Sequence, residues 1–149
     1  MRWRIRWNRA FTLTELSAVV GVIGILAAVA TPSLQGAVQR ARTTEARSLV
    51  VAIAHAEQRA MRDTGRAIPC PPTPAGIPHG VAVPWPSGDA WRALGVSPVG
   101  PIRFQYAVEV EAAGGFRVVA RGDLDGDGVS STFMLDGKTL ELVVTDAEE

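Results

Sequence analysis

The segment FTLTELSAVVGVIGILAAVATPSL, residues 11–34, decides the architecture of this chain. Between Leu16 and Ala30 it carries no charged residue, and Ser17 is its only polar side chain. Counted from Phe11, about 20 residues of helix extend roughly 30 Å, which matches the hydrocarbon core of a bilayer. The sequence therefore predicts a membrane-spanning helix.

The residues before this segment, RWRIRWNRA at positions 2–10, hold four arginines and no acid. Basic flanks stay on the cytoplasmic side, and no Lys or Arg lies between Thr31 and Gln39 on the other side. We therefore expect the N-terminus inside and the body outside. Without its first ten residues the chain holds 11 basic and 15 acidic residues. An acidic body has no reason to bind nucleic acid.

Three kinds of N-terminal segment share this pattern. One is an ordinary single-pass anchor. Another is a secretory signal peptide cut after Ala30, at Ala28-Val29-Ala30, which would leave a secreted or membrane-tethered calcium-binding domain. Neither gives a purpose to Glu15, since a carboxylate inside a bilayer costs about 2.5 kcal/mol or more on insertion scales and usually has a partner. The acid favours the third kind.

The stretch Ala10-Phe11-Thr12-Leu13-Thr14-Glu15-Leu16, followed by the apolar run and Thr31-Pro32-Ser33, resembles the class III signal of type IV prepilins and type II secretion pseudopilins. The resemblance implies that a prepilin peptidase cuts between Ala10 and Phe11 and that the new amine is methylated. Glu15 then becomes the fifth residue and Pro32 the twenty-second, as in the family. Ala10 departs from the family's usual Gly, and Thr14 from its branched apolar residue.

The resemblance also implies a function that is structural and not enzymatic. The chain would be a subunit, major or minor, of a type IV pilus or type II secretion-like pseudopilus. Its partners would be the peptidase and N-methyltransferase, other pilin or pseudopilin subunits and an inner-membrane assembly platform. It would reside in the bacterial inner membrane before entering the filament. There Glu15 would pair with the Phe11 amine of a neighbour, and Pro32 would lie in the assembling helix. Because an unpaired buried charge is heavily penalised, such a pair rewards correct register.

The rest of the chain predicts an α+β fold of the pilin type. We expect a leader at 1–10, a transmembrane and filament-core helix at 11–32, an amphipathic helix at 33–64, a proline-rich connection at 65–100 and a sheet at 101–149. Gly65 is a plausible helix stop. One apolar stripe recurs along the helix at three-, four- and seven-residue steps: Leu34, Val38, Ala41, Leu49, Ile53, Ala56 and Ala60.

The second half of the chain predicts a loop and then a sheet. Seven prolines between residues 68 and 88 predict a surface connection without regular structure. Trp91 and Leu94 indicate a short helical turn anchored in the core. Alternation of apolar and polar residues predicts a strand at 102–111, and Gly114-Gly115 offers a turn after it. With strands at 116–121, 131–135 and 139–144, we expect a four-stranded antiparallel meander. Asp136-Gly137 marks a hairpin between the last two.

Gly122 to Gly128, with the sequence GDLDGDG, is the one candidate ion site. Asp123, Asp125 and Asp127 alternate as oxygen ligands of a calcium loop do, with glycines for a sharp turn. Met134 stands where an EF-hand has its bidentate glutamate, which excludes that fold. Asp136 or backbone carbonyls would complete the shell. The alternative is a solvated turn, since Asp and Gly are common turn residues. Type II secretion major pseudopilins are similar in carrying calcium in a C-terminal loop.

The few cysteines and histidines argue against a disulfide and against a transition-metal site. Cys70 is the only cysteine, so the sequence shown forms no intramolecular disulfide and no cysteine cage for a metal. We interpret Cys70 as a small structural residue. His55 and His79 belong to no cluster, which argues against a transition-metal site.

Overall fold

The computed structural model describes residues 11–112 and 114–145, except for the side chains of residues 32, 33, 35 and 36. The expected leader, residues 1–10, lies outside the described residues. The elements follow in the order α1, β1, α2, β2, β3, β4 and β5. The chain divides into two compact units after Val38, and α1 contributes to both.

α1, Leu13–Thr64, is a continuous helix of 52 residues. It runs through Pro32, which has no N–H to donate to the helical ladder. It ends where Gly65 adopts a φ of +76°, a left-handed conformation that glycine reaches without steric cost. The Gly65 N–H still donates to the Met61 carbonyl at 2.9 Å. The predicted helix stop at Gly65 is confirmed.

The first half of α1 is apolar and uncovered. Leu13–Thr31 is 19 residues long, with a mean hydropathy of 2.1, and none of it is buried within the structure. By length and composition this stretch is sufficient to cross a membrane. The Ser17 hydroxyl donates to the Leu13 carbonyl at 2.9 Å, and the Thr31 hydroxyl donates to the Ala27 carbonyl at 2.8 Å. These two hydroxyl donors are therefore satisfied within the helix itself.

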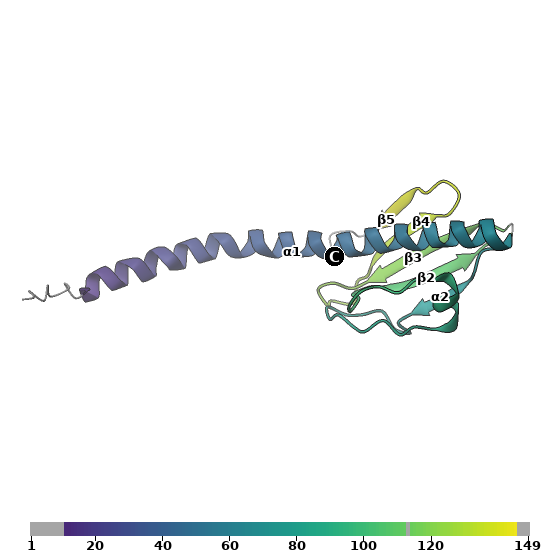
Figure 1. Ribbon diagram of the computed structural model, residues 1–149. Coiled ribbons are helices and arrows are strands. Elements are labelled where there is room, and N and C mark those ends of the chain that lie inside the picture. The colour runs from purple at the N-terminus through teal and green to yellow at the C-terminus, as the bar shows by residue number, and fades with distance from the viewer. Residues whose placement is uncertain (1–10, 113, 146–149) are drawn as a thin grey trace, which may run out of the picture. The chain divides into compact units, whose positions relative to one another are not determined.

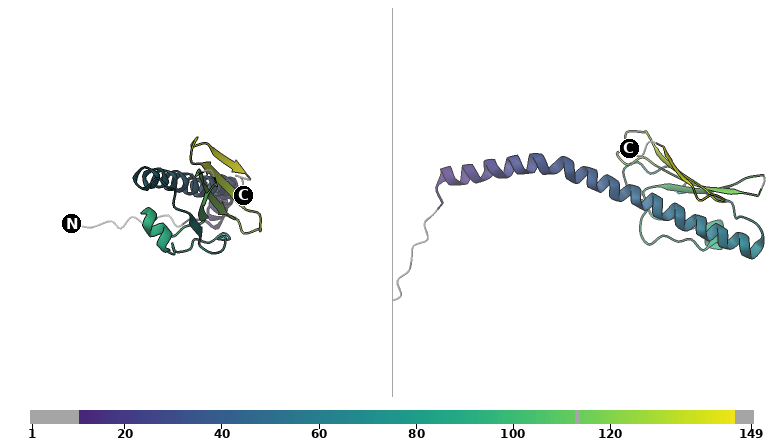
Figure 2. Two further views of the ribbon diagram at one scale, coloured as in Figure 1. Left: turned by 90° about the vertical axis from the view of Figure 1, so that its right-hand side faces the viewer. Right: turned by 90° about the horizontal axis from the view of Figure 1, so that it is seen from above.

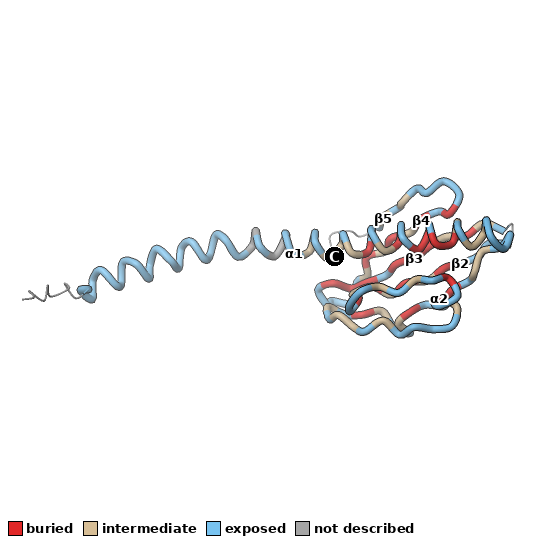
Figure 3. The backbone as a smooth tube through the Cα atoms, viewed as in Figure 1, coloured by how far each residue is buried: buried red, intermediate tan, exposed pale blue. Residues whose placement is uncertain are grey.

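The second half of α1 packs against the sheet (Figures 1 and 3). The buried face consists mainly of small and branched side chains: Ala46, Val50, Ile53, Ala54, Ala56 and Glu57. The stripe expected from the sequence agrees with this face from Leu49 onward. Its first members, Leu34, Val38 and Ala41, are exposed. The amphipathic pattern therefore marks the sheet-binding face only in the later part of the helix.

The sheet has five antiparallel strands in the order β1-β2-β3-β4-β5 (Figure 1). Seen from above, it forms a layer beside the second half of α1 (Figure 2). The strands are β1 Cys70–Thr73, β2 Gln105–Val110, β3 Phe116–Gly122, β4 Ser131–Asp136 and β5 Leu142–Thr145. The predicted α+β pilin architecture is confirmed, with one strand more than the four expected.

The additional strand, β1, lies inside the proline-rich segment, so the prediction of no regular structure there is wrong. β1 is an edge strand that pairs with β2, with Cys70 opposite Val108 and Thr73 opposite Tyr106. The register shifts between these two pairs, where the strand contains two prolines. Proline is tolerated at a sheet edge because its missing donor can face away from the ladder. Burial of Cys70 and Thr73 orients the strand.

Aromatic side chains fill the space between the sheet and α1. Tyr106 lies opposite Ala120, which lies opposite Phe133, and all three are fully buried. The short helix α2, Asp89–Leu94, contributes Trp91, whose indole N–H donates to Thr73 Oγ1 at 2.9 Å and to the Pro71 carbonyl at 3.1 Å. The predicted core role of Trp91 is confirmed, and its indole also fixes β1.

Two strands of the sheet begin later than predicted, and one of them is β2, which begins at Gln105 and not at 102. β4 ends at Asp136, but β5 begins only at Leu142, three residues later than expected. The connection is a wider turn, closed by a hydrogen bond from the Leu140 N–H to the Asp136 carbonyl at 2.9 Å.

Cys70 is buried, and burial raises the pKa of its thiol to about 12. The thiol therefore stays protonated at neutral pH, in keeping with a structural residue.

Candidate functional site

Two places in the described residues combine unusual polar side chains with a defined geometry: the start of α1 and the connection between β3 and β4. At the first, Thr12 precedes the helix and caps it. The Glu15 N–H donates to Thr12 Oγ1 at 3.3 Å, and the Thr12 N–H donates to Glu15 Oε2 at 2.9 Å. The Thr12 hydroxyl donates to the same Oε2 at 2.8 Å. This reciprocal pair is a capping box.

The other residues expected to act in processing and assembly surround this cap. Phe11 lies just before α1, outside the helix, with 76% of its surface exposed. Ala10 lies outside the described residues. Pro32 lies within α1, and its side chain is not among those described. From the sequence we expect Glu15 to find its partner only in the assembled filament, whereas in the structure its carboxylate already accepts hydrogen bonds from Thr12.

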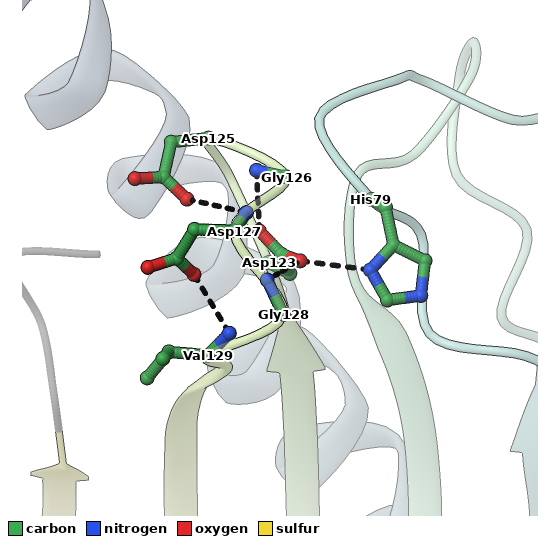
Figure 4. A network of polar contacts seen from close by, with 7 residues as sticks. All are labelled: His79, Asp123, Asp125, Gly126, Asp127, Gly128 and Val129. Atoms are coloured by element: carbon green, nitrogen blue, oxygen red, sulfur yellow. Dashed lines mark hydrogen bonds and ion pairs between the residues drawn. The ribbon is translucent and has the colours of Figure 1, made fainter.

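The second place is the loop from Asp123 to Val129 (Figure 4), which follows β3. Gly122, the last residue of β3, brings the loop close to the core, because a Cβ added there would lie 2.5 Å from Phe104 Cδ1. Gly126 and Gly128 have φ values of +86° and +95°, which only glycine adopts readily. These glycines let three aspartates share one tight turn.

Asp123 is the centre of this loop and is fully buried. Its Oδ1 accepts the Gly126 N–H at 2.6 Å, and its Oδ2 accepts the Gly128 N–H at 2.9 Å. His79 Nδ1 lies 2.8 Å from the same Oδ2. The hydrogen bond from His79, with those from the two backbone N–H groups, lowers the pKa of Asp123 to about 2 against the opposing effect of burial. Asp123 therefore remains a carboxylate at neutral pH.

Asp125 and Asp127 are exposed, and their carboxylates lie on the side of the loop away from His79 (Figure 4). Asp125 Oδ1 accepts the Asp127 N–H at 3.2 Å, and Asp127 Oδ1 accepts the Val129 N–H at 2.7 Å. One carboxylate oxygen from each of Asp123, Asp125 and Asp127 lies within 4.8 Å of the others. The structure therefore brings together the three predicted ligands, in a loop that their hydrogen bonds already organise.

Asp136, the fourth ligand suggested by the sequence, does not join this group. It lies at the far end of β4, and six residues of strand extend about 20 Å. Its Oδ1 accepts the N–H groups of Lys138 and Thr139, both at 2.8 Å. These bonds lower the pKa of Asp136 and cap the turn before β5. We therefore leave Asp136 out of the candidate ion site.

Sequence reasoning missed the residues that fix this loop to the rest of the molecule. The Gly80 N–H donates to the Asp123 carbonyl at 2.7 Å, next to the His79 contact. From α1, Arg42 Nη1 donates to the Leu124 carbonyl at 3.1 Å. His79 and Arg42 are 44 and 82 residues from their partners, so no local spacing could reveal them. The loop is thus fixed by both the proline-rich segment and the helix.

Comparisons with curated proteins cover most of the chain. No family model matches it, and no solved structure matches it. Among curated proteins, a type IV major pilin protein PilE1 of Neisseria gonorrhoeae is 31% identical over 135 residues, which cover 91% of this chain and 67% of that protein. A second PilE1 is 30% identical over 91% of this chain and 62% of its own length. A third is 31% identical over 83% of this chain and 47% of its own length.

The chain thus spans about half to two thirds of the length of these relatives. The similarity runs along most of this chain and is not confined to the apolar segment. The fold agrees with it, since an apolar helix continues into a helix packed on an antiparallel sheet. This chain belongs to the type IV pilin family.

Proposed function

We propose that this chain is a structural subunit, a major or minor pilin or a pseudopilin, that polymerises through the first half of α1. The carrying observation is the stretch Leu13–Thr31, which is long enough to cross a membrane and has no cover within the structure. Its large aliphatic side chains need a bilayer or other helices around them, because exposing them to water is unfavourable. Family membership supports a structural role over a catalytic one.

Before assembly, the subunit resides in the bacterial inner membrane with its arginine-rich N-terminus in the cytoplasm and its sheet outside. The asymmetry of basic residues on the two sides of the apolar run supports this orientation. A prepilin peptidase and N-methyltransferase then cuts between Ala10 and Phe11 and methylates the new amine. Exposure of Phe11 outside the helix supports access to that bond.

In the filament, the Glu15 carboxylate meets the Phe11 amine of a neighbouring subunit while the apolar halves pack together. Subunits are passed from the membrane into the filament by an inner-membrane assembly platform. An opposite charge offsets the desolvation that each group would carry alone. The pair therefore favours the register in which both groups meet.

Two measurements test this function. N-terminal sequencing of the mature protein should begin at Phe11; a start at Thr31 would instead establish a signal peptide and a secreted domain. Glu15→Ala should insert into the membrane at the parent level but yield few or no shear-released filaments. Glu45→Ala is a matched control, because Glu45 lies on the same helix but binds Arg103 beside the sheet. Normal filament yield from Glu15→Ala would refute the pairing.

We further propose that Asp123, Asp125 and Asp127 bind calcium. The close approach of their oxygens supports this, because a hard cation favours several carboxylate oxygens and offsets their mutual repulsion. Calcium should raise the thermal midpoint of the full chain in detergent relative to EDTA. Asp125→Asn with Asp127→Asn should remove the difference, whereas Asp136→Asn should keep it. Equal midpoints with and without calcium would count against the site.

A further inference from the structure

Three exposed arginines gather where α1 ends, on the side of the helix turned away from the sheet. Arg59 and Arg62 are three residues apart and therefore share one face of the helix, and Arg66 follows just beyond its last turn. Glu57, on the opposite face, is fully buried. None of the ion pairs among the described residues uses these arginines, and Asp63 is the one acid among them. This face of the helix is therefore positively charged and has no partner within the described chain.

The loop from Asp123 to Val129 presents the opposite charge. Asp125 and Asp127 are exposed, and among the described residues their carboxylates accept hydrogen bonds only from backbone N–H groups. Asp123 is buried and contacts His79, so the two exposed carboxylates carry the surface charge of the loop. Calcium would leave the loop negative, because three carboxylates carry three negative charges and the ion carries two positive ones.

Two contacts place these charges at opposite ends of the sheet-packed unit, which comprises the second half of α1 and the sheet. At one end, Arg42 donates to the Leu124 carbonyl in the acidic loop. At the other end, Gln58 Nε2 donates to the Gly137 carbonyl at 3.3 Å, and β4 connects the two ends. From Arg42 to Arg62, about 20 residues of helix extend roughly 30 Å. The acidic loop and the arginines of one chain are therefore too far apart to pair.

We propose that the arginines at the end of α1 bind the acidic loop of a second copy, so that the sheet-packed units contact one another head to tail in the filament. This inference rests on the proposed function, in which the chain polymerises, and it adds the surfaces through which these units meet. A contact between two different surfaces of identical chains repeats from copy to copy. Where it does not close into a ring, it builds an open helical filament.

The charges decide the orientation of neighbouring copies more than they hold the filament together. Exposed ion pairs are individually weak and are screened by salt, so most of the affinity has to come from the apolar first half of α1. Two copies that met through the same end would bring like charges together, which is unfavourable. The charged ends therefore favour the head-to-tail arrangement over a two-fold one.

The first test links neighbouring units chemically. Arg62→Cys and Asp127→Cys are placed in one chain, which keeps Arg59 and Asp125 for the contact, and shear-released filaments are treated with a short bismaleimide. We expect a ladder of multimers on a denaturing gel, because each link joins different ends of two copies. The link cannot close within one chain, because its two ends are separated by roughly 30 Å of helix.

The two variants with only one of these substitutions are the matched controls. Both should remain monomeric on the gel, since Cys70 is buried and its thiol stays protonated. Only monomers from linked filaments of the two-cysteine chain would overturn the proposal. Dimers from either control would overturn it too, because they would show that like ends meet.

The second test exchanges the charges, and it decides the matter if the two-cysteine chain forms few filaments. At equal amounts of membrane-bound protein, Arg59→Glu with Arg62→Glu should lower the yield of shear-released filaments several-fold. Asp125→Lys with Asp127→Lys should do the same. All four substitutions together restore opposite charges across the contact and should recover most of the yield. A folding defect at one end would not be repaired by substitutions at the other.

The outcomes separate this inference from the function on which it rests. Arg92→Glu should keep the parent yield, because Arg92 is exposed but pairs with Asp89 of its own chain. Parent-level yields from both charge reversals, no recovery in the combined variant, or an equal loss in Arg92→Glu would overturn the contact while the parent still forms filaments. Parent-level filaments from Glu15→Ala would instead remove the pairing in the proposed function and leave the contact between the charged ends standing.

Discussion

The two halves of α1 place their side chains in opposite environments. In the first half, branched aliphatic residues such as Val22 and Ile23 are more than half exposed. In the second half, Val50 and Ile53 are fully buried against the sheet, and alanines occupy most of the remaining buried face. The apolar face of the second half is thus covered by the sheet of the same chain. The apolar surface of the first half needs a bilayer or other helices to cover it.

This difference explains how the proposed filament can form without loss of the sheet-packed unit, which begins at Gln39 and contains the sheet and the second half of α1. In the buried half, alanines alternate with Val50 and Ile53 on the face that meets the aromatic side chains of the sheet. The exposed half carries large aliphatic side chains that no part of the described chain covers. Substitutions placed at matched positions in the two halves should therefore separate the stability of the sheet-packed unit from membrane insertion and assembly.

A charge placed in each half should give the largest contrast. Val22→Asp puts a carboxylate in the apolar stretch without the cap that Glu15 has, at a cost of about 2.5–3.5 kcal/mol on insertion scales. We expect loss of membrane-bound protein and of filaments. Val51→Asp, at a partly exposed position of the second half, should leave both near the parent level. Membrane fractionation measures the effect, and equal losses from the two variants would contradict the comparison.

The same truncation in each half should separate stability. Ile53→Ala removes a fully buried side chain and should destabilise the sheet-packed unit by about 2–5 kcal/mol. Ile23→Ala removes an exposed side chain and should leave that unit's stability unchanged. Denaturant unfolding of the full chain in a mild detergent, followed by tryptophan fluorescence, measures both. A loss of stability in Ile23→Ala as large as that in Ile53→Ala would mean that the halves do not differ in this way.

The smallest expected effect concerns Glu57, the acid on the buried face. Its Oε2 accepts the Ile68 N–H at 2.9 Å, and burial raises the pKa of its carboxyl above the ordinary value of 4.5. The folded state holds the proton more tightly than the unfolded chain. The contribution of Glu57 to stability is therefore greatest at pH values below the pKa of the unfolded chain. It is lost as the pH rises through the higher pKa of the folded state.

Glu57→Gln keeps an acceptor for Ile68 and removes the charge. We expect its thermal midpoint to exceed that of the parent near pH 8 and to converge with it near pH 4. Glu57→Ala removes the acceptor as well and should melt below Glu57→Gln at both pH values. Midpoints of the parent and Glu57→Gln that stay parallel across the pH range would contradict a raised pKa.

Much of this fold could be predicted because its signals are local. The apolar run, Gly65 as helix stop and the alternating residues of β2 to β4 each follow from a short stretch of sequence. The start of β5 was misplaced because Asp136-Gly137 resembles a two-residue hairpin, whereas the turn extends to Glu141. β1 was missed because prolines argue against a strand, and only the partner β2 makes an edge strand of them.

The candidate sites also contain some features that are local in the sequence and others that depend on distant residues. The aspartates of the loop were found together because they lie within five residues of one another, but Asp136 was added by proximity in sequence and is separated by the length of β4. The contacts of His79 and Arg42 to the loop could not be predicted, since they depend on where the proline-rich segment and α1 lie in the folded unit.

Residue types and their spacing are enough to predict a helix that begins with a membrane-length apolar stretch, carries an acid near its start and is followed by an antiparallel sheet. These properties depend on the types of neighbouring residues and on the spacing at which apolar residues recur, and both can be read from short stretches of the chain. The partners of Glu15 and Asp136 lie within three residues of them, so these contacts are local, whereas Asp123 meets His79, 44 residues away, only in the folded unit. A hydrogen bond requires a distance of a few ångströms and a suitable direction, and residues far apart in sequence meet those conditions only after the sheet and the helix have packed.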